Sequence, residues 1–513
     1  MAPLSPDVDV LVVGAGAMGS GIAHVAALSG HTVYLYDTRP DAPAKGRSGI
    51  ESDLRFLVGK GRLSEDDAAA ALGRIVPLVR LQDAKDVGLA IEAIVENLEV
   101  KQTLFRELES LLGVDAILAT NTSSLSVTAI GAALTRPERL VGMHFFNPAP
   151  RMKLVEVISG LATDRDVAET VHATARAWGK VPVHALSTPG FIVNRVARPY
   201  YAEALRIVGE QAARPQTVDA IMRECCGFPM GPFELMDLIG LDVNFAVTCS
   251  VFDAFFGDRR YTPSLLQREL VDAGRLGRKS GHGFYDYAHG AVRPEPQTEA
   301  GQKAEPMVTV VGDLGVAAAL IGRLEKAGIE VRRTQGESVA AGPGHGWIRI
   351  GHARLELSDG RTATRRAFEE QVPHLVLFDL CLDYAETGRI VLAHADQCGA
   401  GAFASVVGTL QQAGLAVTRI DDVAGMVGLR TVAMLANEAA DGVLQGIGSA
   451  SDVDTAMRYG TNYPKGPLEW ADTQGVAYVA RTLANLREHY GEERYRVSPL
   501  IQRKAFNGES FHE

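Results

Sequence analysis

Short apolar runs alternate with segments of helical period in the first part of the chain. The apolar runs have the length of strands and lie at residues 10–13, 33–35, 89–94, 116–119 and 140–143. Strands that alternate with helices are typical of β–α–β units, so we expect an α/β domain with a parallel, doubly wound sheet over residues 1–187. Residues 41–71, rich in Ala, Asp, Arg and Glu, are too many for a loop and predict a helical excursion from that sheet.

The pattern changes to helical spacing after the Pro-Gly pair at 189–190. Strand-like runs are then scarce until 283–287, so we expect a mostly helical domain over residues 188–287. Residues 288–306 read AHGAVRPEPQTEAGQKAEP and contain almost no large apolar side chains. This composition predicts a linker.

The first strand pattern ends in a glycine-rich turn. Residues 10–37 read VLVVGAGAMGSGIAHVAALSGHTVYLYD, so Gly14, Gly16 and Gly19 directly follow the strand and open a helix. In this order the first glycine permits a sharp turn, the second lets a pyrophosphate approach the backbone, and the third permits close packing of helix on strand. The N-terminus of the helix offers free N–H groups to phosphates.

A second strand pattern follows this helix and ends in Asp37, 18 residues past Gly19. A carboxylate at this place accepts hydrogen bonds from a ribose 2′-hydroxyl, and its charge repels a 2′-phosphate. The series of strand, glycines, helix, strand and acid therefore predicts a Rossmann-type dinucleotide site that prefers NAD to NADP. The alternative is a glycine-rich turn in a parallel sheet that binds nothing.

A second unit of similar pattern follows the linker. Residues 307–315 read MVTVVGDLG, but the glycine turn is incomplete. Gly312 is kept, whereas Leu314 and Ala317 stand where the second and third glycines belong. A leucine side chain obstructs the approach of a pyrophosphate, so we expect a degenerate, structural Rossmann-like domain without a cofactor over residues 307–420.

The helical domain occurs twice. PGFIVNRVARPYYAEAL in the first copy aligns with AGMVGLRTVAMLANEAA in the last part of the chain at a constant offset of 235 positions. This offset pairs Arg195 with Arg430 and Glu203 with Glu438, and GPFELMDLIG with GPLEWADTQG. We therefore expect a second helical domain over residues 421–513.

Composition narrows the class of protein. The 513 residues suggest three or four domains, and a net charge of −11 without a basic block argues against a nucleic-acid partner. The five cysteines form no CxxC pair, which is typical of unlinked thiols in a reducing compartment. The N-terminus has no signal-peptide pattern and no run of about 18 apolar residues occurs, so we expect a cytoplasmic protein with no membrane partner.

Polar clusters follow the ends of three presumed parallel strands, at the sheet edge where open α/β sheets bind ligands. They read EAIVENLEVK at 92–101, NTSSL at 121–125 and HFFNPAPRMKLVE at 144–156, and GFIVNR at 190–195 opens the helical domain. In the third cluster, His144 and Glu156 can form a dyad if the Asn-Pro-Ala-Pro turn returns the chain.

Such a dyad suits the oxidation of an alcohol by NAD. Histidine takes the hydroxyl proton near neutral pH, and a carboxylate on its other ring nitrogen fixes the tautomer and stabilises the imidazolium. The alternative reading of His144 is a histidine that is simply hydrogen-bonded at the end of a strand.

These clusters resemble the 3-hydroxyacyl-CoA dehydrogenase family in both residues and separations. The similar segments are GAGAMGSGIA, VENLEVK, NTSSL, HFFNPAPRMKLVEV, TPGFIVNR and GRKSGHGFYDY, and together they cover most of residues 7–287. The domain order resembles that of the longer bacterial members, several of which act in phenylacetate degradation on 3-hydroxyadipyl-CoA or as 3-hydroxybutyryl-CoA dehydrogenases.

The resemblance implies NAD-dependent, reversible oxidation of a short-chain or dicarboxylic (S)-3-hydroxyacyl-CoA to the 3-oxoacyl-CoA, by a homodimer without a metal. It implies that His144 is the general base, that Glu156 orients it, and that Ser123 and Asn194 hold the 3-oxygen of the substrate. It also implies a set of NAD-binding residues. These are Gly14, Gly16, Ala17, Met18, Gly19, Asp37, Glu96, Lys101, Asn121, Ser123, Asn147 and Lys279.

The resemblance leaves two parts of the substrate site open. The family contacts CoA with lysines in the helical excursion, where this chain has Lys45, Arg47, Arg55 and Lys60. The alternative is that these four form a solvated helix face. A dicarboxylic substrate also needs a cation at its far end, for which Arg151 and Arg198 are candidates.

The second helical copy lacks the asparagine, because the offset places Leu429 opposite Asn194, and no HFFNP-like cluster precedes it. We interpret this copy as structural and expect the two copies to pack on each other as a pseudo-dimer. Two rival functions remain open: a β-hydroxyacid dehydrogenase, which uses a lysine as its acid–base group, and a non-catalytic NAD-binding protein like the lens crystallin related to the family. The His144–Glu156 cluster argues against the first and the complete set of catalytic residue types against the second. We do not expect a fused hydratase, because the predicted domains leave no segment to hold one.

Overall fold

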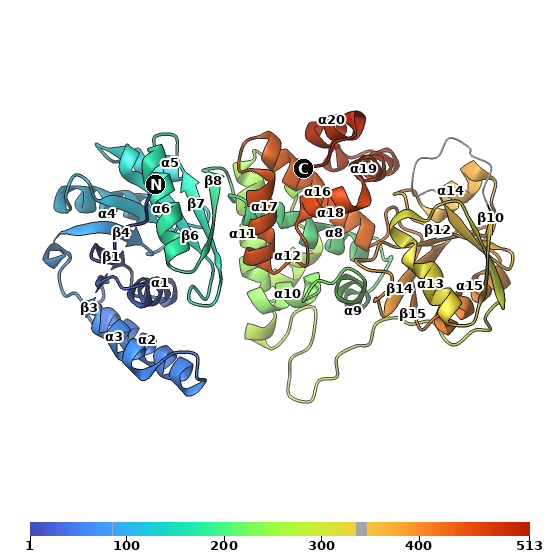
Figure 1. The fold of residues 1–513 in the computed structure, drawn as a ribbon, viewed down its shortest axis with the longest axis horizontal. Coiled ribbons are helices and arrows are strands. Elements are labelled where there is room, and N and C mark those ends of the chain that lie inside the picture. The colour runs from blue at the N-terminus through green and yellow to red at the C-terminus, as the bar shows by residue number, and fades with distance from the viewer. Residues whose placement is uncertain (85, 335–345, 513) are drawn as a thin grey trace. The chain divides into compact units, whose positions relative to one another are not determined.

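The computed structural model describes residues 1–84, 86–334 and 346–512. The chain forms two compact units (Figure 1). Unit 1 comprises Met1–Arg195 and Gly442–Thr461, and unit 2 comprises Val196–Asp441 and Asn462–Glu513.

Unit 1 contains an eight-stranded sheet in the order β3-β2-β1-β4-β5-β6-β7-β8. Its strands are β1 (Asp9–Val13), β2 (Val33–Tyr36), β3 (Ile75–Pro77), β4 (Val87–Glu92), β5 (Ile117–Thr120), β6 (Leu140–Phe145), β7 (Leu154–Ser159) and β8 (Val181–Leu186). Neighbouring strands are parallel, as predicted, except that β7 runs antiparallel to β6. The strands that the sequence predicts are β1, β2, β4, β5 and β6, and these are all parallel. Strand β7 was not predicted, and it is antiparallel because the short loop after β6 cannot form the long crossover that parallel neighbours require.

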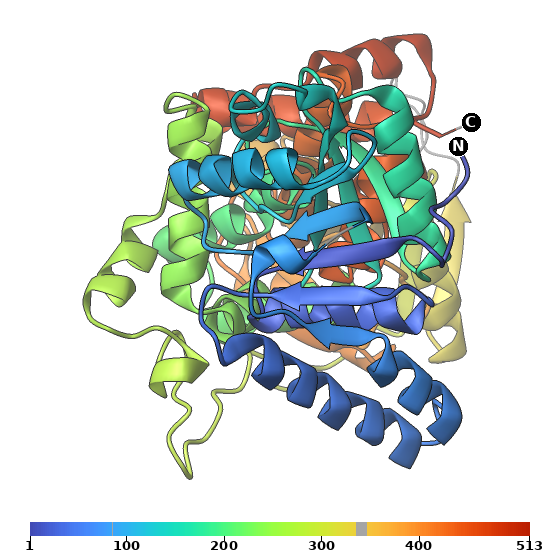
Figure 2. The ribbon, with the colours of Figure 1, turned by 90° about the vertical axis from the view of Figure 1, so that its left-hand side faces the viewer.

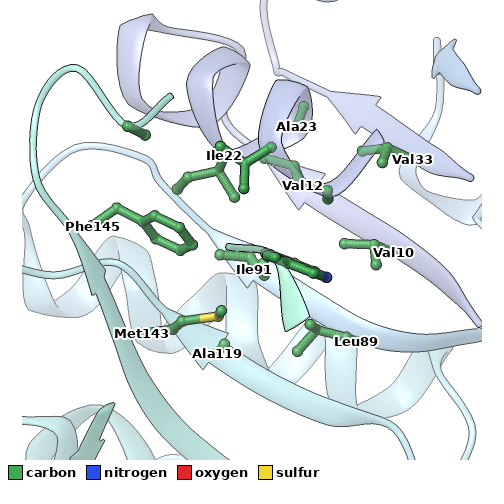
Figure 3. Close-up of a cluster of buried hydrophobic side chains, with 14 of the residues drawn as sticks. Val10, Val12, Ile22, Ala23, Val33, Leu89, Ile91, Ala119, Met143 and Phe145 are labelled. Carbon is green, nitrogen blue, oxygen red and sulfur yellow. The ribbon is translucent and has the colours of Figure 1, made fainter. Parts of the chain in front are cut away.

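The main helices of unit 1 are α1 (Ala17–Leu28), α2 (Ala42–Gly59), α3 (Glu65–Gly73), α4 (Leu98–Leu111), α5 (Val127–Gly131) and α6 (Arg165–Ala177). The pair α2–α3 is the predicted helical excursion, and it packs on α1 and on the sheet edge at β3 (Figure 2). The strands are buried on both faces. On one face, Val12 of β1 and Ile91 of β4 pack with Ile22 of α1 and Phe145 of β6 (Figure 3).

Unit 1 also contains a segment from the second helical copy. Helix α17 (Ala450–Thr461) packs on β7 and β8, and the Leu186 amide donates to the carbonyl of Ile447 just before this helix, at 2.9 Å. Gly460 contributes no side chain here, and a Cβ on it would collide with Leu154. The first sheet is therefore completed by residues that lie far along the chain.

Unit 2 holds the rest of both helical copies. The first copy forms α8 (Arg198–Gly209), α9 (Pro215–Ala220), the π-helical turn η3 (Ile221–Cys225), α10 (Pro232–Ile239), α11 (Leu241–Ala254), η4 (Arg259–Tyr261) and α12 (Leu265–Asp272), after the short α7 (Val193–Val196). The second forms α16 (Gly428–Leu444), which begins in unit 2, α18 (Pro467–Gln474), α19 (Val476–Tyr490), η7 (Glu493–Tyr495) and α20 (Pro499–Asn507). The strand-like run at 283–287 is not a strand: it forms a turn with isolated bridges, because its amides bond to Asp237 of α10.

The second sheet has seven strands in the order β10-β9-β11-β12-β13-β14-β15. They are β9 (Met307–Val311), β10 (Glu330–Thr334), β11 (Trp347–Ile350), β12 (Ala353–Leu357), β13 (Leu375–Phe378), β14 (Arg389–His394) and β15 (Ala416–Arg419), with α13 (Ala319–Lys326), α14 (Ala363–Glu370) and α15 (Ala400–Gln412). The sheet is mixed, because β11 is antiparallel to both its neighbours. The predicted linker has no helix or strand, but it is held along this domain by bonds such as Glu299 N–H to Val417 O at 2.8 Å.

The two helical copies meet through a reciprocal set of buried polar contacts in unit 2. Glu203 accepts hydrogen bonds from Arg430 at 2.7 Å and from the hydroxyl of Tyr495 at 2.8 Å. Its counterpart Glu438 accepts from the hydroxyl of Tyr261 at 2.6 Å and also pairs with an arginine of the first copy. Each copy thus supplies a glutamate to a tyrosine of the other, which is the self-complementary pattern of a two-fold interface.

Among the described residues, no single helix is long and apolar enough to cross a membrane, and only the bent pair α10 and α11 passes that test jointly.

Candidate active site

The glycine turn after β1 has the geometry that its sequence predicts. Gly14 has φ +105°, and a Cβ on it would collide with the backbone of Ala93. A Cβ on Gly19 would collide with the carbonyl of Gly14, so close packing of α1 on the turn requires glycine there. A Cβ on Gly16, in contrast, meets nothing within 4 Å. The space in front of Gly16 is open, as the approach of a pyrophosphate requires.

Asp37 closes this turn from the end of β2. Its carboxylate accepts hydrogen bonds from the Ala15 amide at 2.8 Å and from the Arg39 amide at 2.9 Å. Burial alone would raise the pKa of Asp37, but the hydrogen bonds from Arg39 and Ala15 and the charge of Arg39 together lower it. An ionised carboxylate is therefore fixed beside the turn.

A cavity of about 620 Å³ opens between α1, α2 and the loop after β6, in unit 1. Gly16 and Ala17 line it, as does Asn147, whose bond to Pro148 is cis. Of the four basic residues of the helical excursion, only Lys45 lines this cavity. Arg47 bonds to backbone carbonyls, Arg55 pairs with Glu51, and Lys60 lies over the ring of Phe56.

A buried ionic network supports the loop that carries Ser123. Lys101 is 1% exposed, and its ammonium pairs with Glu92 at 2.5 Å and with Glu96 at 3.3 Å. Glu96 accepts from the Thr122 hydroxyl at 2.7 Å and from the Ser123 amide at 2.9 Å. Burial alone would raise the pKa of Glu96, but Lys101 and these hydrogen bonds lower it to about 2. The predicted residue Lys101 therefore acts through Glu96, and the sequence reasoning missed Glu92.

The remaining predicted NAD-binding residues lie on different elements. Asn121 follows β5, and its side-chain oxygen accepts from the amide of Phe145 in β6 at 2.8 Å. Met18 is part of α1. Lys279 belongs to unit 2, where it pairs with Asp242 at 2.6 Å.

His144 and Glu156 face each other across the antiparallel pair β6–β7, in register. His144 Nδ1 lies 2.7 Å from Glu156 Oε2, and both residues are buried, at 6% and 0% exposure. With a proton on Nδ1, toward the carboxylate, the lone pair of Nε2 is free to accept a proton. The spacing of twelve residues thus produces the predicted dyad, because the connecting loop returns the chain directly opposite the histidine.

Glu156 has a second role that its sequence position does not reveal. Its Oε1 accepts hydrogen bonds from the amides of Ile192 and Val193 at 3.1 and 2.9 Å, at the start of α7. These two bonds fix the backbone next to Asn194, the residue that follows Val193. The side-chain amide of Asn194 donates to the backbone carbonyl of Ser123 at 3.4 Å. One carboxylate therefore holds both the histidine and the segment that carries the asparagine.

The second copy keeps this helix-capping role and loses the histidine. Asp379, at the end of β13, accepts hydrogen bonds from the amides of Gly428 at 2.6 Å and Leu429 at 2.9 Å. By the offset of 235, Gly428 corresponds to Val193, and Val427, whose amide also donates to Asp379 at 3.0 Å, corresponds to Ile192. Every hydrogen bond to the carboxylate of Asp379 in the described part of the chain comes from a backbone amide.

Comparisons with known proteins agree with this architecture. The NAD binding domain of 3-hydroxyacyl-CoA dehydrogenase matches residues 9–188, and the C-terminal domain of that enzyme matches twice, at 190–287 and 425–510. The 3-hydroxybutyryl-CoA dehydrogenase reduced Rossmann-fold domain matches residues 355–423.

Individual relatives cover the whole chain or its first half. 3-Hydroxyadipyl-CoA dehydrogenase of Escherichia coli is 44% identical over 502 residues, which are 97% of each chain. 3-Hydroxybutyryl-CoA dehydrogenase of Clostridioides difficile is 43% identical over 276 residues, which are 54% of this chain and 98% of that one. The crystal structure of 3-hydroxybutyryl-CoA dehydrogenase from Escherichia coli superposes with a TM-score of 0.88 at 43% identity and covers 98% of this chain and 99% of that chain.

The family models span both helical copies as well as the NAD-binding domain. The structure also contains the predicted glycine turn, the carboxylate at the end of β2 and the histidine–glutamate pair. The chain belongs to the 3-hydroxyacyl-CoA dehydrogenase family and is an NAD-dependent oxidoreductase of its long form.

Proposed function

We propose that this enzyme oxidises the 3-hydroxyl group of its acyl-CoA substrate with His144 as the general base, oriented by Glu156. The observation that carries the proposal is the buried hydrogen bond of 2.7 Å between the two side chains. NAD, when bound at the open glycine turn, supplies the acceptor for the hydride that leaves C3. The side chains of the protein handle the proton.

In this proposal Nε2 of His144 takes the proton of the hydroxyl group, and the ring becomes an imidazolium. Glu156 stabilises that charge, because its carboxylate is already hydrogen-bonded to Nδ1. Ser123 and Asn194 hold the 3-oxygen, and Asn194 is fixed near the Ser123 backbone. In the reverse reaction His144 returns the proton as a general acid.

We also propose places for the rest of the ligands. Glu96, Asn121, Asn147 and Lys279 contribute to the NAD site, with Lys101 acting through Glu96. CoA contacts Lys45, which lines the cavity of unit 1 next to Asp41. The substrate is a short-chain or dicarboxylic 3-hydroxyacyl-CoA, since relatives are named for 3-hydroxybutyryl-CoA and for 3-hydroxyadipyl-CoA.

The finer assignments of assembly and setting are also proposals. The enzyme acts in the cytoplasm as a homodimer, in the catabolism of phenylacetate or fatty acids. The domains are the NAD-binding domain at 1–187, the first helical domain at 188–287, the linker at 288–306, the degenerate sheet domain at 307–420 and the second helical domain at 421–513. Gel filtration with light scattering tests the dimer.

The test of the mechanism is the variant His144→Ala, assayed by NADH absorbance in both directions with 3-hydroxybutyryl-CoA and acetoacetyl-CoA. General base catalysis contributes about 10²–10⁴-fold, so kcat should fall by that factor. His184→Ala is a matched control, because His184 also lies near a glutamate, 3.7 Å from Glu169, but on β8. Near-full activity of His144→Ala, or an equal loss in His184→Ala, would contradict the proposal.

A further inference from the structure

Unit 2 contains a cavity of about 390 Å³ that the reaction chemistry does not use. It lies between α8, α11 and the segment from η4 to α12. Its wall combines apolar side chains with four arginines and four uncharged polar residues, which suits a ligand that has both a charged group and an apolar part. The polar side chains that enter the argument are Arg198, Thr248 and Ser264.

Arg198 at the start of α8 is a buried cation without an anionic partner. It is 6% exposed, its Nη1 donates to the Thr248 hydroxyl at 3.1 Å, and its Nε has no hydrogen-bond partner. Within the described residues Arg198 forms no ion pair with a carboxylate, and its guanidinium lies over the ring of Tyr201. Burial lowers the pKa of Arg198. A buried charge left in this state is costly unless an anion completes it.

The other arginines that line the cavity differ in this respect. Their side chains all pair with carboxylates of unit 2: Arg206 with Glu492 at 2.9 Å, Arg260 with Glu438 at 3.1 Å and Arg494 with Glu203 at 3.8 Å. Arg198 is therefore the cation in this wall whose charge is available to a ligand.

The second helical copy shows that the helical fold does not need this polar pair. The offset of 235 places Ala433 opposite Arg198 and Leu483 opposite Thr248. Both replacements are completely buried. The copy that lost the catalytic asparagine thus has an apolar pair at the same positions, and the copy that kept the asparagine has a buried arginine held by a threonine.

The guanidinium is oriented for a carboxylate. Thr248 donates its own hydroxyl proton to the Asn244 carbonyl at 3.0 Å, so its oxygen is committed to accepting from Nη1 of Arg198. This leaves the edge formed by Nε and Nη2, which matches the two oxygens of a carboxylate. The hydroxyl of Ser264 also lines the cavity and caps no helix amide, so it is a further donor.

The distance along the chain also fits. Asn194 precedes Arg198 by four residues, a length of chain that spans at most about 14 Å. In a six-carbon dicarboxylic chain the distal carboxyl carbon lies three bonds beyond C3, or about 4 Å. Arg198 thus lies only four residues along the chain from the asparagine that the proposed function places at the 3-oxygen.

We propose that the Arg198 cavity binds the distal carboxylate of a dicarboxylic 3-hydroxyacyl chain, and that Arg198, positioned by Thr248, selects such substrates over those that end in a methyl group. The proposal rests on the proposed function, and it assigns the part of the substrate that the His144–Glu156 pair does not touch. The cavity holds the carboxylate, and the apolar side chains around it contact the methylene groups.

The experiment compares kcat/KM for 3-hydroxyadipyl-CoA and 3-hydroxyhexanoyl-CoA, which have the same chain length and differ only at the far end. The wild-type enzyme should prefer the dicarboxylic substrate. Arg198→Leu should lower kcat/KM for it by about 10- to 150-fold, the range expected for hydrogen bonds to a charged group, and change the value for 3-hydroxyhexanoyl-CoA by less than about threefold. Arg198→Lys should retain part of the preference, because it keeps the charge and loses the two-point geometry.

Two further variants control for loss of activity that is caused by misfolding. The double variant Arg198→Ala/Thr248→Leu copies the pair that the second copy already tolerates, so it should fold and behave like Arg198→Leu. Arg275→Leu removes an exposed arginine three residues after α12 and should leave kcat/KM for both substrates unchanged. An equal loss on both substrates, or a preference that depends on Arg151 and not on Arg198, would overturn the proposal. If the wild-type enzyme oxidises both substrates equally, the role of Arg198 is wrong but the proposed function stands. If the enzyme is inactive on every 3-hydroxyacyl-CoA, the proposed function is wrong as well.

Discussion

Replacing Glu156 with glutamine separates the two roles of this carboxylate. Glu156→Gln keeps the size of the side chain but removes its charge and turns one oxygen into an N–H₂ group. In the native protein the carboxylate contacts His144 Nδ1 at 2.7 Å and the backbone amides of Ile192 and Val193 at 3.1 and 2.9 Å. The N–H₂ group of the glutamine must face either the histidine or these two backbone amides. No rotation satisfies all three donors, because the carboxylate accepts at both ends and the amide accepts at one.

The magnitudes of the two losses follow from these contacts. If the N–H₂ group faces His144, the ring takes the wrong tautomer, a change that costs about 10⁴-fold in kcat in a comparable triad. If it faces the two backbone amides, the buried donors lose their acceptor, which costs about 1–3 kcal/mol of the free energy of unfolding. We expect kcat to fall by about 10²–10⁴-fold and stability to fall by about 1–3 kcal/mol.

The assay combines NADH absorbance with urea unfolding followed by circular dichroism. Asp379→Asn is the matched control, since Asp379 caps the corresponding helix of the second copy without a histidine. It should lower stability and leave kcat unchanged. His144→Ala and the double variant His144→Ala/Glu156→Gln complete a cycle, in which the kinetic losses should not add, because the two side chains act as one unit. Additive kinetic losses, or a Glu156→Gln enzyme with near-wild-type kcat, would refute this reasoning.

Three further predictions concern binding and stability. Gly16→Ala should fold normally and raise KM for NAD, because its Cβ enters the open space in front of the glycine turn. Gly19→Ala should fail to fold stably, because its Cβ collides with the Gly14 carbonyl. Thermal unfolding and NAD titration distinguish the two variants. Burial raises the pKa of Asp219 from 3.8 to about 7, so the stability that its protonated form contributes is full below about pH 4 and is lost as pH rises to about 7. Asp219→Asn should therefore flatten the fall in Tm between about pH 4 and pH 7, and an unchanged slope would contradict this. Arg430→Met leaves Glu203 as a buried charge that has lost its principal partner and should cost about 3–5 kcal/mol in urea unfolding; a loss below about 1 kcal/mol would show that the contact between the helical copies does not depend on it.

Sequence patterns predicted the contact between His144 and Glu156 because strand geometry fixes it. In an antiparallel pair two residues face each other when the loop between them has the right length, and HFFNPAPRMKLVE gives that length for His144 and Glu156. The glycine turn was predictable for a similar reason, since the role of each glycine depends on local backbone geometry alone. Both features could be predicted because they depend only on the spacing of residues that are close in sequence.

Contacts that depend on distant segments were not predictable in this way. The burial of Lys101 between Glu92 and Glu96 depends on how α4 packs against the end of β4, which no spacing encodes. The capping of α16 by Asp379 joins residues 49 and 50 positions apart. The unpaired state of Arg198 depends on which carboxylates the fold leaves out of reach.

The packing of α17 on β7 and β8 has a consequence for the order in which the protein is made. Residues 1–195 leave the ribosome first, but the helix that covers part of their sheet ends at Thr461, which is 266 residues later (461 − 195). At about 5–20 residues per second this interval lasts roughly 13 to 53 s. During that time the nascent NAD-binding domain exposes the apolar faces of β7 and β8, so its synthesis in the cell depends on protection of that surface until the chain is almost complete.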